Sequence, residues 1–422
     1  MKNDARSSGL ASSSTARNIN RDIVLELIRT TQPIARVELA RMSGLQPSTI
    51  SQIVEQLLAE GWIVEGSAVL RPRGRRPTML SLNGDMLVLA VDLHPTQALV
   101  AAFDLHSRQL TQEQVPVHHD PARSTEVILA AIKSVRAKHP GKRFEGIGVS
   151  VPGRVDPERQ ELILAPNLAW SGFDLRKVLQ RRTGLQVEME NEANVSLIDE
   201  IWSGRIGDYQ NIVLVSISEG IGAAILVNGQ MVTGKSGMAG EFGHISLDPN
   251  GPVCGCGRRG CWEMFSSTRA TLRHYRHISR SRAAITIADL VSMAEAGDKS
   301  AIAALQHQAT YFGKGLQIVV TSLAPELIIA TGDVTLSWPG FASTVQAELS
   351  SHLLAGKPPE LSIIARSDLT RLRGAAALVL QRHAGYHRYT HIRRSTDVFC
   401  RKDSRQAISR NSITADRARC GE

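Results

Sequence analysis

Near the start of the chain, apolar side chains recur three times at the three- and four-residue spacing of a helix. The first stretch spans 19–28, the second spans 37–42 and stops at Gly44, and the third spans 50–58 after Pro47. Glycine commonly ends a helix, and proline is tolerated at a first helical position. The pattern therefore predicts two helices, a glycine-bearing turn and a third helix, which is a helix-turn-helix.

The segment after the third helix has the pattern of two strands joined by a basic loop. An apolar strand begins at Trp62, the segment 71–77 holds four arginines and two prolines, and a second strand is predicted at 79–82. These features extend the prediction to a winged helix-turn-helix over 18–82, with a three-helix interaction module as the alternative. Short polar side chains at the start of the third helix and arginines of the loop are the predicted DNA contacts: Ser48, Thr49, Ser51, Gln52, Arg73, Arg75 and Arg76.

The body of the chain, from 83 to 384, has the pattern of two related α/β halves. The first half predicts strands near 87–93, 98–105, 110–117 and 146–151 and a helix near 124–138. The second half predicts strands at 211–218, 223–227, 327–331 and 361–365 and helices at 268–277, 286–322 and 341–354. Paired strands before alternating helices predict a ribonuclease-H-like fold used twice, with a ligand cleft between the lobes.

Charge is concentrated at the two ends of the chain. Residues 1–82 hold 11 Lys and Arg against 7 Asp and Glu, a net of +4, and residues 386–422 hold 9 against 4, a net of +5. Because the whole chain carries +9, the 303 residues between are neutral. A basic end on a neutral body predicts that the end meets phosphate and the body meets an uncharged ligand. Segments 1–17 and 385–422 are predicted to be a disordered leader and a disordered basic tail.

Three of the five cysteines lie within eight residues, at Cys254, Cys256 and Cys261, and His244 precedes them. Three thiolates and one imidazole are the donors of a closed tetrahedral zinc site. Buried structural cysteines are the alternative, but three of them among glycines in so short a loop cannot all be core residues. The loop 244–261 is therefore predicted to hold a structural zinc ion.

The cysteine content also bears on the compartment. An odd number of cysteines, clustered for metal binding, is typical of a reducing environment. No apolar run approaches the roughly 18 residues that would span a bilayer. We therefore expect a cytoplasmic protein with no membrane insertion.

Motifs around these cysteines resemble the signature of the ROK family, which comprises sugar-responsive repressors, uncharacterised reading frames and sugar kinases. The resemblance rests on Gly-Glu-Phe-Gly-His at 240–244, the run 254–263, Pro-Asn-Leu-Ala-Trp at 166–170 and Asn-Glu-Ala-Asn at 191–194. It covers about residues 18 to 384 and implies the two-lobed, actin-like body of the sugar kinases. It also implies sugar contacts from Asn167, Asn191, Glu192, Glu241, His244 and Glu263, although any one of these could instead cap a helix or turn.

The chain departs from the nucleotide motifs of ROK kinases. Those enzymes begin the body with Asp-x-Gly-Gly-Thr, whereas this chain has Asp-Leu-His-Pro-Thr at 92–96, and proline supplies no amide donor for phosphate. The second phosphate motif survives only in part at 220–224, and Asp333 follows Gly332 where the kinases have further glycine. Glu192 is one methylene longer than the kinases' catalytic aspartate. These departures predict a protein that is not an enzyme and does not bind ATP.

Together these features predict a sugar-responsive transcriptional regulator, most simply a repressor of a carbohydrate operon. It would bind a double-stranded DNA operator as a homodimer or tetramer and leave it when a free sugar closes the cleft. Two alternatives remain open: an ATP-dependent ROK sugar kinase, and a repressor controlled by a transport-system protein.

Overall fold

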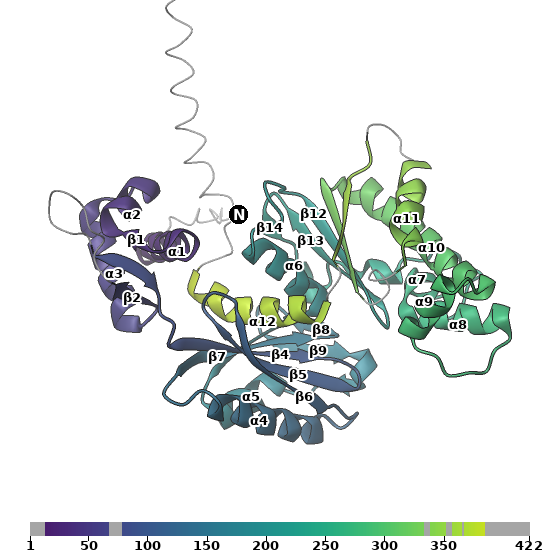
Figure 1. Ribbon diagram of the computed structural model, residues 1–422, viewed down its shortest axis with the longest axis horizontal. Helices are drawn as coiled ribbons and strands as arrows, with labels where there is room; N and C mark the ends of the chain where they lie inside the picture. The colour runs from purple at the N-terminus through teal and green to yellow at the C-terminus, as the bar shows by residue number, and fades with distance from the viewer. Residues whose placement is uncertain (1–12, 67–77, 333–337, 352–356, 365–366, 385–422) are drawn as a thin grey trace, which may run out of the picture.

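The computed structural model describes residues 13–66, 78–332, 338–351, 357–364 and 367–384 of the chain. A small helical domain lies at one end of the molecule, one α/β lobe lies below it, and a second α/β lobe lies at the opposite end (Figure 1). This arrangement confirms the predicted fold class, an N-terminal helix-turn-helix domain followed by a two-lobed body.

The small domain contains three helices and a three-stranded antiparallel sheet in the order β1-β3-β2. Gly44 ends α2 in the left-handed conformation, with φ 72°, and Pro47 is the first residue of α3, both as predicted. Helix α1 begins five residues before the predicted domain boundary at 18. The elements are α1 (Ser13–Thr31), β1 (Ile34–Ala35), α2 (Arg36–Ser43), α3 (Pro47–Glu60), β2 (Ile63–Gly66) and β3 (Met79–Leu82).

The first lobe is built on a five-stranded sheet in the order β11-β7-β4-β5-β6. Helices α4 and α5 cover one face of this sheet, and α12 covers the other (Figure 1). Three short strands and a 3-10 turn η1 follow β7 and form a separate small sheet. The elements are β4 (Met86–Leu93), β5 (Gln97–Asp104), β6 (Gln109–Pro116), α4 (Pro121–Ala137), β7 (Arg143–Val151), β8 (Arg154–Asp156), β9 (Glu161–Ala165), η1 (Pro166–Leu168), β10 (Trp170–Ser171), α5 (Leu175–Thr183), β11 (Gln186–Asn191) and α6 (Glu192–Trp202).

The second lobe repeats the plan with a sheet in the order β14-β13-β12-β15-β16. In both lobes the first strand pairs with an antiparallel neighbour on one side and a parallel neighbour on the other, which confirms the predicted repeat. The elements are β12 (Ile212–Ile217), β13 (Ile221–Val227), β14 (Gln230–Met231), η2 (Lys235–Gly237), η3 (Glu241–His244), α7 (Glu263–Ser266), α8 (Thr268–Ser279), α9 (Ile287–Glu295), α10 (Lys299–Leu323), β15 (Leu327–Gly332), α11 (Gly340–Ser351), β16 (Glu360–Ile364) and α12 (Ser367–Ala384).

The single helix predicted for 286–322 is wrong, because the chain forms two helices there. Helix α9 ends at Glu295, Gly297 adopts φ 88°, and Asp298 caps the start of α10 by accepting a hydrogen bond from the Ala301 amide. The apolar spacing continues through the break and hides it. A left-handed glycine followed by an aspartate cap is the local signal that separates the two helices.

The last helix, α12, returns from the second lobe to pack against the first. It contacts β4, β7 and α6, and two glycines, one on β7 and one on α12 itself, permit the close packing. A Cβ at Gly148 on β7 would lie 1.7 Å from the Ala375 carbonyl oxygen, and a Cβ at Gly374 would lie 2.0 Å from that of Val195. Any side chain at these two glycines would force α12 away from the sheet or from α6.

Two arginines of α12 are paired with aspartates of the first lobe. The Arg371 guanidinium donates from Nε to Oδ2 of the fully buried Asp92 at 2.9 Å. Arg373 donates from Nη2 to Asp199 on α6 at 2.8 Å. Burial alone would raise the pKa of Asp92, but Arg371 and His94 together hold that pKa below its ordinary value of 3.8. The buried carboxylate is therefore charged and depends on its arginine.

The small domain is packed onto the body and shares its core. Val24 and Ile28 of α1 belong to the same buried cluster as Trp202 of α6 and Leu380 of α12.

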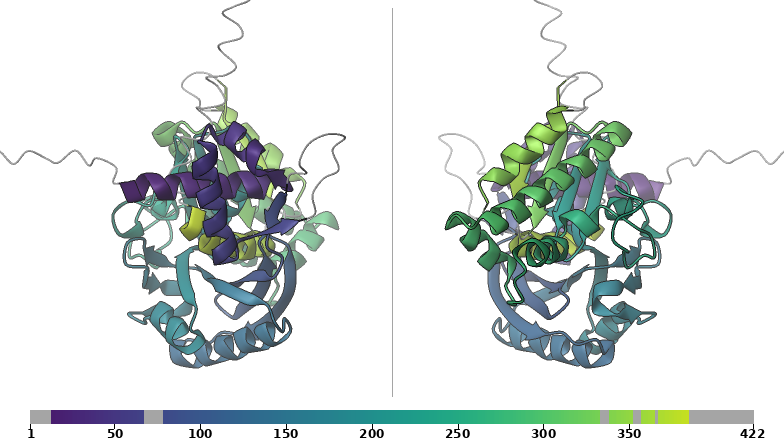
Figure 2. Two further views of the ribbon diagram at one scale, coloured as in Figure 1. Left: turned by 90° about the vertical axis from the view of Figure 1, so that its left-hand side faces the viewer. Right: turned by 90° about the vertical axis from the view of Figure 1, so that its right-hand side faces the viewer.

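Figure 2 shows the two ends of the molecule, with α1, α2 and α3 in front in one view and the helices of the second lobe in front in the other. No helix in the described part of the chain combines the length and the apolar character that a bilayer crossing requires.

Replacing Arg371 with Ala should destabilise the body strongly, because it leaves the Asp92 carboxylate buried without its cation. Removing one partner of a buried ion pair costs about 3 to 5 kcal/mol. Urea unfolding followed by circular dichroism should show this loss. Because the folded pKa of Asp92 is depressed, its contribution is present above the unfolded value and should fade as pH falls through the folded pKa.

The matched control is Arg182→Ala, which removes an arginine from an exposed pair with Glu126. Water screens that pair, so the unfolding midpoint should barely move. Equal midpoints for the two variants would show that the buried pair does not hold α12 in place.

Candidate functional site

The four predicted metal ligands converge in the second lobe. His244 ends the 3-10 turn η3, and the three cysteines lie in the loop before α7. Isolated bridges between Ser246 and Cys261 and between Val253 and Arg259 fold this loop back on itself. One ligand atom from each of His244, Cys254, Cys256 and Cys261 lies within 4.8 Å of all the others.

Two distances between these ligand atoms match those around one tetrahedral ion. Ligand atoms about 2.0 to 2.3 Å from a tetrahedral zinc ion lie about 3.5 to 3.8 Å from one another. The Cys254 Sγ to His244 Nδ1 distance is 3.6 Å, and the Cys256 Sγ to Cys261 Sγ distance is also 3.6 Å. Burial raises the pKa of the Cys254 and Cys261 thiols, a direction that a divalent cation between them would reverse. The donor set and its geometry therefore suit a closed metal site.

Glu241 and Glu263 lie on either side of the imidazole of His244. Oε2 of Glu241 is 3.6 Å from Nε2 of His244, and Oε1 of Glu263 is 3.5 Å from Nδ1. Oε1 of Glu263 also accepts a hydrogen bond from the Cys254 thiol at 2.9 Å. The structure thus places two carboxylates beside the imidazole of His244.

The turn between β12 and β13 connects these carboxylates to the start of α6. The Ser218 hydroxyl lies 3.5 Å from Oε1 of Glu192, the first residue of α6. On the other side of the turn, a Cβ at Gly220 would lie 2.8 Å from Oε2 of Glu263. Glu192 and Glu263 therefore both lie beside this turn. Ser218 was not predicted, and no spacing in the sequence singles it out.

Asn191 caps a helix, which is the alternative role that the sequence analysis left open for it. Its Oδ1 accepts from the Ala193 amide and caps α6, while its Nδ2 donates to the Gly153 carbonyl at 2.8 Å. One Nδ2 hydrogen and one Oδ1 lone pair remain for a ligand. The neighbouring Glu190 carboxylate accepts hydrogen bonds from the Asn194 side chain and the Asn191 backbone amide. Burial raises the pKa of Glu190.

Asn167 belongs to the first lobe, at the turn η1 between β9 and β10. It is half-buried and forms no side-chain hydrogen bond within the described part of the chain. Leu168 and Trp170 beside it are buried and fix the turn, and the Trp170 indole donates to the His118 carbonyl at 3.1 Å. The structure therefore leaves the Asn167 amide available to a ligand.

The segment 92–96 stands where the kinases have their first phosphate motif. Its Asp92 carboxylate is bonded by two side chains of this protein. The His94 amide donates to the Gln97 carbonyl at 2.8 Å, and Pro95 has no amide hydrogen. Nε2 of His94 and Nε of Arg371 each lie 2.9 Å from Oδ2 of Asp92. The His94 amide and ring and the Arg371 guanidinium therefore all bond within the protein. The cation beside Asp92 is Arg371, which comes from α12.

Gly332 is the last residue of β15 and pairs with Ile217 of β12. Gly332 has φ 129°, and a Cβ there would lie 1.8 Å from the Ile217 carbonyl oxygen, so its backbone is pressed against β12. Asp333, predicted to place a negative charge near the nucleotide, lies outside the described residues.

The predicted DNA contacts on α3 lie at its N-terminal end. Ser48 and Gln52 are exposed, whereas Thr49 and Ser51 are half-buried, and the Ser51 hydroxyl donates to the Pro47 carbonyl. The apolar stripe faces inward, with Ile50, Ile53, Val54 and Leu57 buried. Arg73, Arg75 and Arg76 lie outside the described residues.

Comparisons with curated proteins find repressors over most of the chain. The chain is 30% identical over 351 residues to the xylose repressor of Bacillus spizizenii, covering 82% of this chain and 90% of that protein. It is 26% identical over 379 residues to the DNA-binding transcriptional dual regulator NagC of Escherichia coli, covering 87% and 93%.

Solved structures of a regulator and of a kinase match this chain over different shares of its length. A ROK family transcriptional regulator, a homologue of the Escherichia coli Mlc protein, matches 90% of this chain and 99% of its own at a TM-score of 0.77 and 25% identity. A ROK family glucokinase from Streptomyces griseus, in complex with glucose and AMPPNP, matches 70% of this chain and 99% of its own at a TM-score of 0.64 and 25% identity. The ROK family model matches residues 88–382, and the chain belongs to the ROK family.

Proposed function

We propose that this protein is a DNA-binding repressor that a free sugar releases from its operator. Glu241 and Glu263 lie beside His244, and Glu192 and Glu263 lie beside the turn at 218–220. Carboxylate oxygens are suited to accept hydroxyl donors of a polyol. The observation that carries the choice of sensor over kinase is the hairpin at Asp92, which is closed by Arg371. Relatives named as repressors over most of the chain support the same choice.

The sugar site in this proposal consists of Asn167, Asn191, Glu192, Glu241, His244 and Glu263. Asn167 comes from the first lobe and the last three residues from the second, so a ligand that contacts both would draw the lobes together. The metal is zinc in this proposal, and its role is structural, since His244, Cys254, Cys256 and Cys261 fill four positions. It holds His244 and the neighbouring carboxylates in one orientation.

Helix α6 is the element that would carry the response to the DNA-binding domain. It begins at Glu192, is buried from Ala193 to Trp202, and ends beneath α1. The Arg29 guanidinium of α1 lies 4.4 Å from the centroid of the Trp202 ring. The same junction is lined by Leu25, Glu26, Arg29, Trp62, Leu82, Leu105, Trp202 and Leu380. A shift of α6 at its sugar end would therefore reach the small domain at its other end.

Glu192→Ala should abolish release by sugar while operator affinity without sugar stays native, because Glu192 lies far from α3 in the chain and the fold. Fluorescence anisotropy on duplex DNA from upstream of the gene, titrated with xylose first and then with other free sugars, measures both quantities. Glu161→Ala, an exposed carboxylate of β9, is the matched control and should respond as the native protein. A native response in Glu192→Ala would remove Glu192 from the site, and release by no sugar in the native protein would favour control by a protein partner.

Cys256→Ser should lose the metal, because three ligands hold a structural zinc much less tightly than four. Emission spectroscopy should find about one zinc per native chain and far less in the variant, with a lower melting temperature. Cys400→Ser, outside the described residues, should keep the native content. Equal zinc in the native protein and in Cys256→Ser would contradict the assignment.

Arg29→Met should weaken the coupling between sugar and DNA without weakening sugar binding itself. The methionine keeps much of the apolar contact but removes the cation from the Trp202 ring, a contact worth about 0.5 to 2 kcal/mol. The ratio of operator affinities with and without sugar should fall by several-fold, while sugar affinity measured by calorimetry stays native. Arg29→Lys keeps a cation over the ring and should keep the ratio, whereas an equal loss in both variants would exclude the cation from the coupling.

A further inference from the structure

Helix α8 carries a stripe of arginines on its outer side. Arg269, Arg273, Arg276 and Arg280 follow at three- and four-residue spacing, so they lie along one side of the helix and its C-terminal end. All four are exposed. Across 264–288 the sequence holds five arginines, two histidines and no aspartate or glutamate. The neutral charge of the whole body conceals this local concentration.

The stripe has no acidic partner in the described part of the chain. Arg273 donates to the carbonyl of Met264, and burial together with the charge of Arg269 lowers its pKa. The nearest acids in sequence are Glu263 on α7, which accepts from the Cys254 thiol, and Asp289 on α9, which accepts from the Thr286 amide and hydroxyl. Like charges at these spacings repel one another, although the helix dipole favours Arg276, which lies in the last turn of α8.

A row of stacked rings lies beside the stripe, between α7, α8 and α10. The ring centroids of Phe265 and Tyr311 are 4.5 Å apart, those of Tyr311 and His307 are 4.6 Å apart, and those of His307 and His274 are 3.9 Å apart. The Lys314 ammonium lies 4.9 Å from the Tyr311 ring. The row therefore adds flat, rigid side chains and another cation to the surface.

One atom of this row is left without a partner. Nδ1 of His307 is buried and has no hydrogen-bond partner among the described residues. Burial, with the charges of His274 and Lys314, lowers the pKa of His307 to about 4, so the ring is neutral near pH 7. Buried polar atoms are nearly always hydrogen-bonded, and His307 Nδ1 is one of several exceptions among the described residues.

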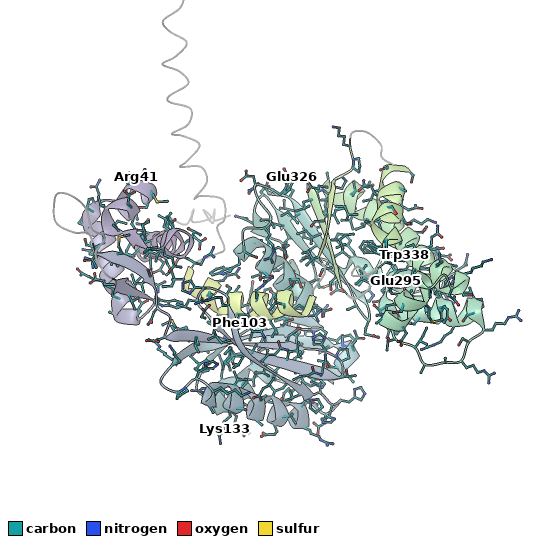
Figure 3. All side chains as sticks on the ribbon, viewed as in Figure 1. Arg41, Phe103, Lys133, Glu295, Glu326 and Trp338 are labelled. Atoms are coloured by element: carbon teal, nitrogen blue, oxygen red, sulfur yellow. The ribbon has the colours of Figure 1, made fainter. Side chains whose placement is uncertain are left out.

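The composition of this surface fits another protein. Arginine and aromatic side chains are enriched at the centres of protein interfaces. A second copy of this chain is disfavoured, because a two-fold contact would set the stripe against itself. Duplex DNA is disfavoured by position: α8 lies at the opposite end of the molecule from α3, as the places of Glu295 on α9 and Arg41 on α2 show (Figure 3).

We propose that the α8 face, formed by the arginine stripe and by Phe265, His274, His307 and Tyr311, is a docking surface for an acidic face of another protein. Charge complementarity selects the partner, and the ring row supplies the contact area. This inference does not rest on the sugar response, so the two can fail separately.

Binding of fluorescein-labelled poly-L-glutamate to the full chain, followed by anisotropy, tests the proposal. Arg269→Glu with Arg276→Glu should weaken binding by at least about tenfold, because each change replaces attraction with repulsion. Tyr311→Ala should also weaken binding, and its effect should persist at about 0.15 M salt, since no charge is removed. The matched control is Arg123→Glu with Lys133→Glu, which makes the same charge change on exposed positions of α4 (Figure 3).

Equal losses in the two double variants would show a general effect of net charge and would overturn the proposal. Native affinity in Tyr311→Ala would remove the ring row from the surface and would also overturn the proposal.

A second measurement adds the upstream duplex and an unrelated duplex to the poly-L-glutamate complex. Both peptide and duplex should be bound together, whereas displacement of the peptide by either duplex would make α8 a nucleic-acid surface and overturn the proposal.

Discussion

Helix α12 is the element on which the three parts of the molecule depend. It lies between the sheet of the first lobe, α6 and α1, and it is fixed by the pairing of Arg371 with the buried Asp92. A carboxylate and a guanidinium taken out of water are tolerated only together, so the position of α12 is specified within narrow limits. Gly148 and Gly374 also restrict the position of α12. At each of them a carbonyl oxygen occupies the place that a side chain would take. The first lobe is therefore complete only when α12 has packed against it.

The same contacts that fix α12 also define what can move. Helix α6 is held to α12 through Asp199 and Arg373, and its buried length runs from the proposed sugar site to the small domain. Since the core cluster of the small domain continues into α6 and α12, the domain cannot turn independently of them. A ligand that shifts α6 by a small amount must repack this junction, because close-packed interiors transmit strain. The fold thus favours concerted displacement over free motion of the small domain.

Local sequence patterns predicted much of this structure. Contacts between residues far apart in the sequence could not be predicted. The stripe of α3 and the spacing of Cys254, Cys256 and Cys261 are short-range patterns, so the helix and the convergence of ligands followed from them. The helix pair at 286–322 was merged because apolar spacing continues across Gly297. Asp92 and Arg371 stand 279 positions apart, and no local pattern links a strand to a helix at that distance. The sequence therefore indicated an altered phosphate motif at 92–96. Only the structure reveals that Arg371 pairs with Asp92 there.

The magnitude of the response that such a regulator needs is compatible with these small contacts. A sugar that prefers the DNA-incompetent state about 100-fold supplies about 2.7 kcal/mol of coupling. A cation over an aromatic ring contributes about 0.5 to 2 kcal/mol, depending on how far water is excluded from it. Arg29 over Trp202, with the few apolar side chains around it, therefore has an energy of the required order. A body that shares the architecture of sugar kinases can then act as a switch by exchanging a handful of contacts, without making or breaking a covalent bond.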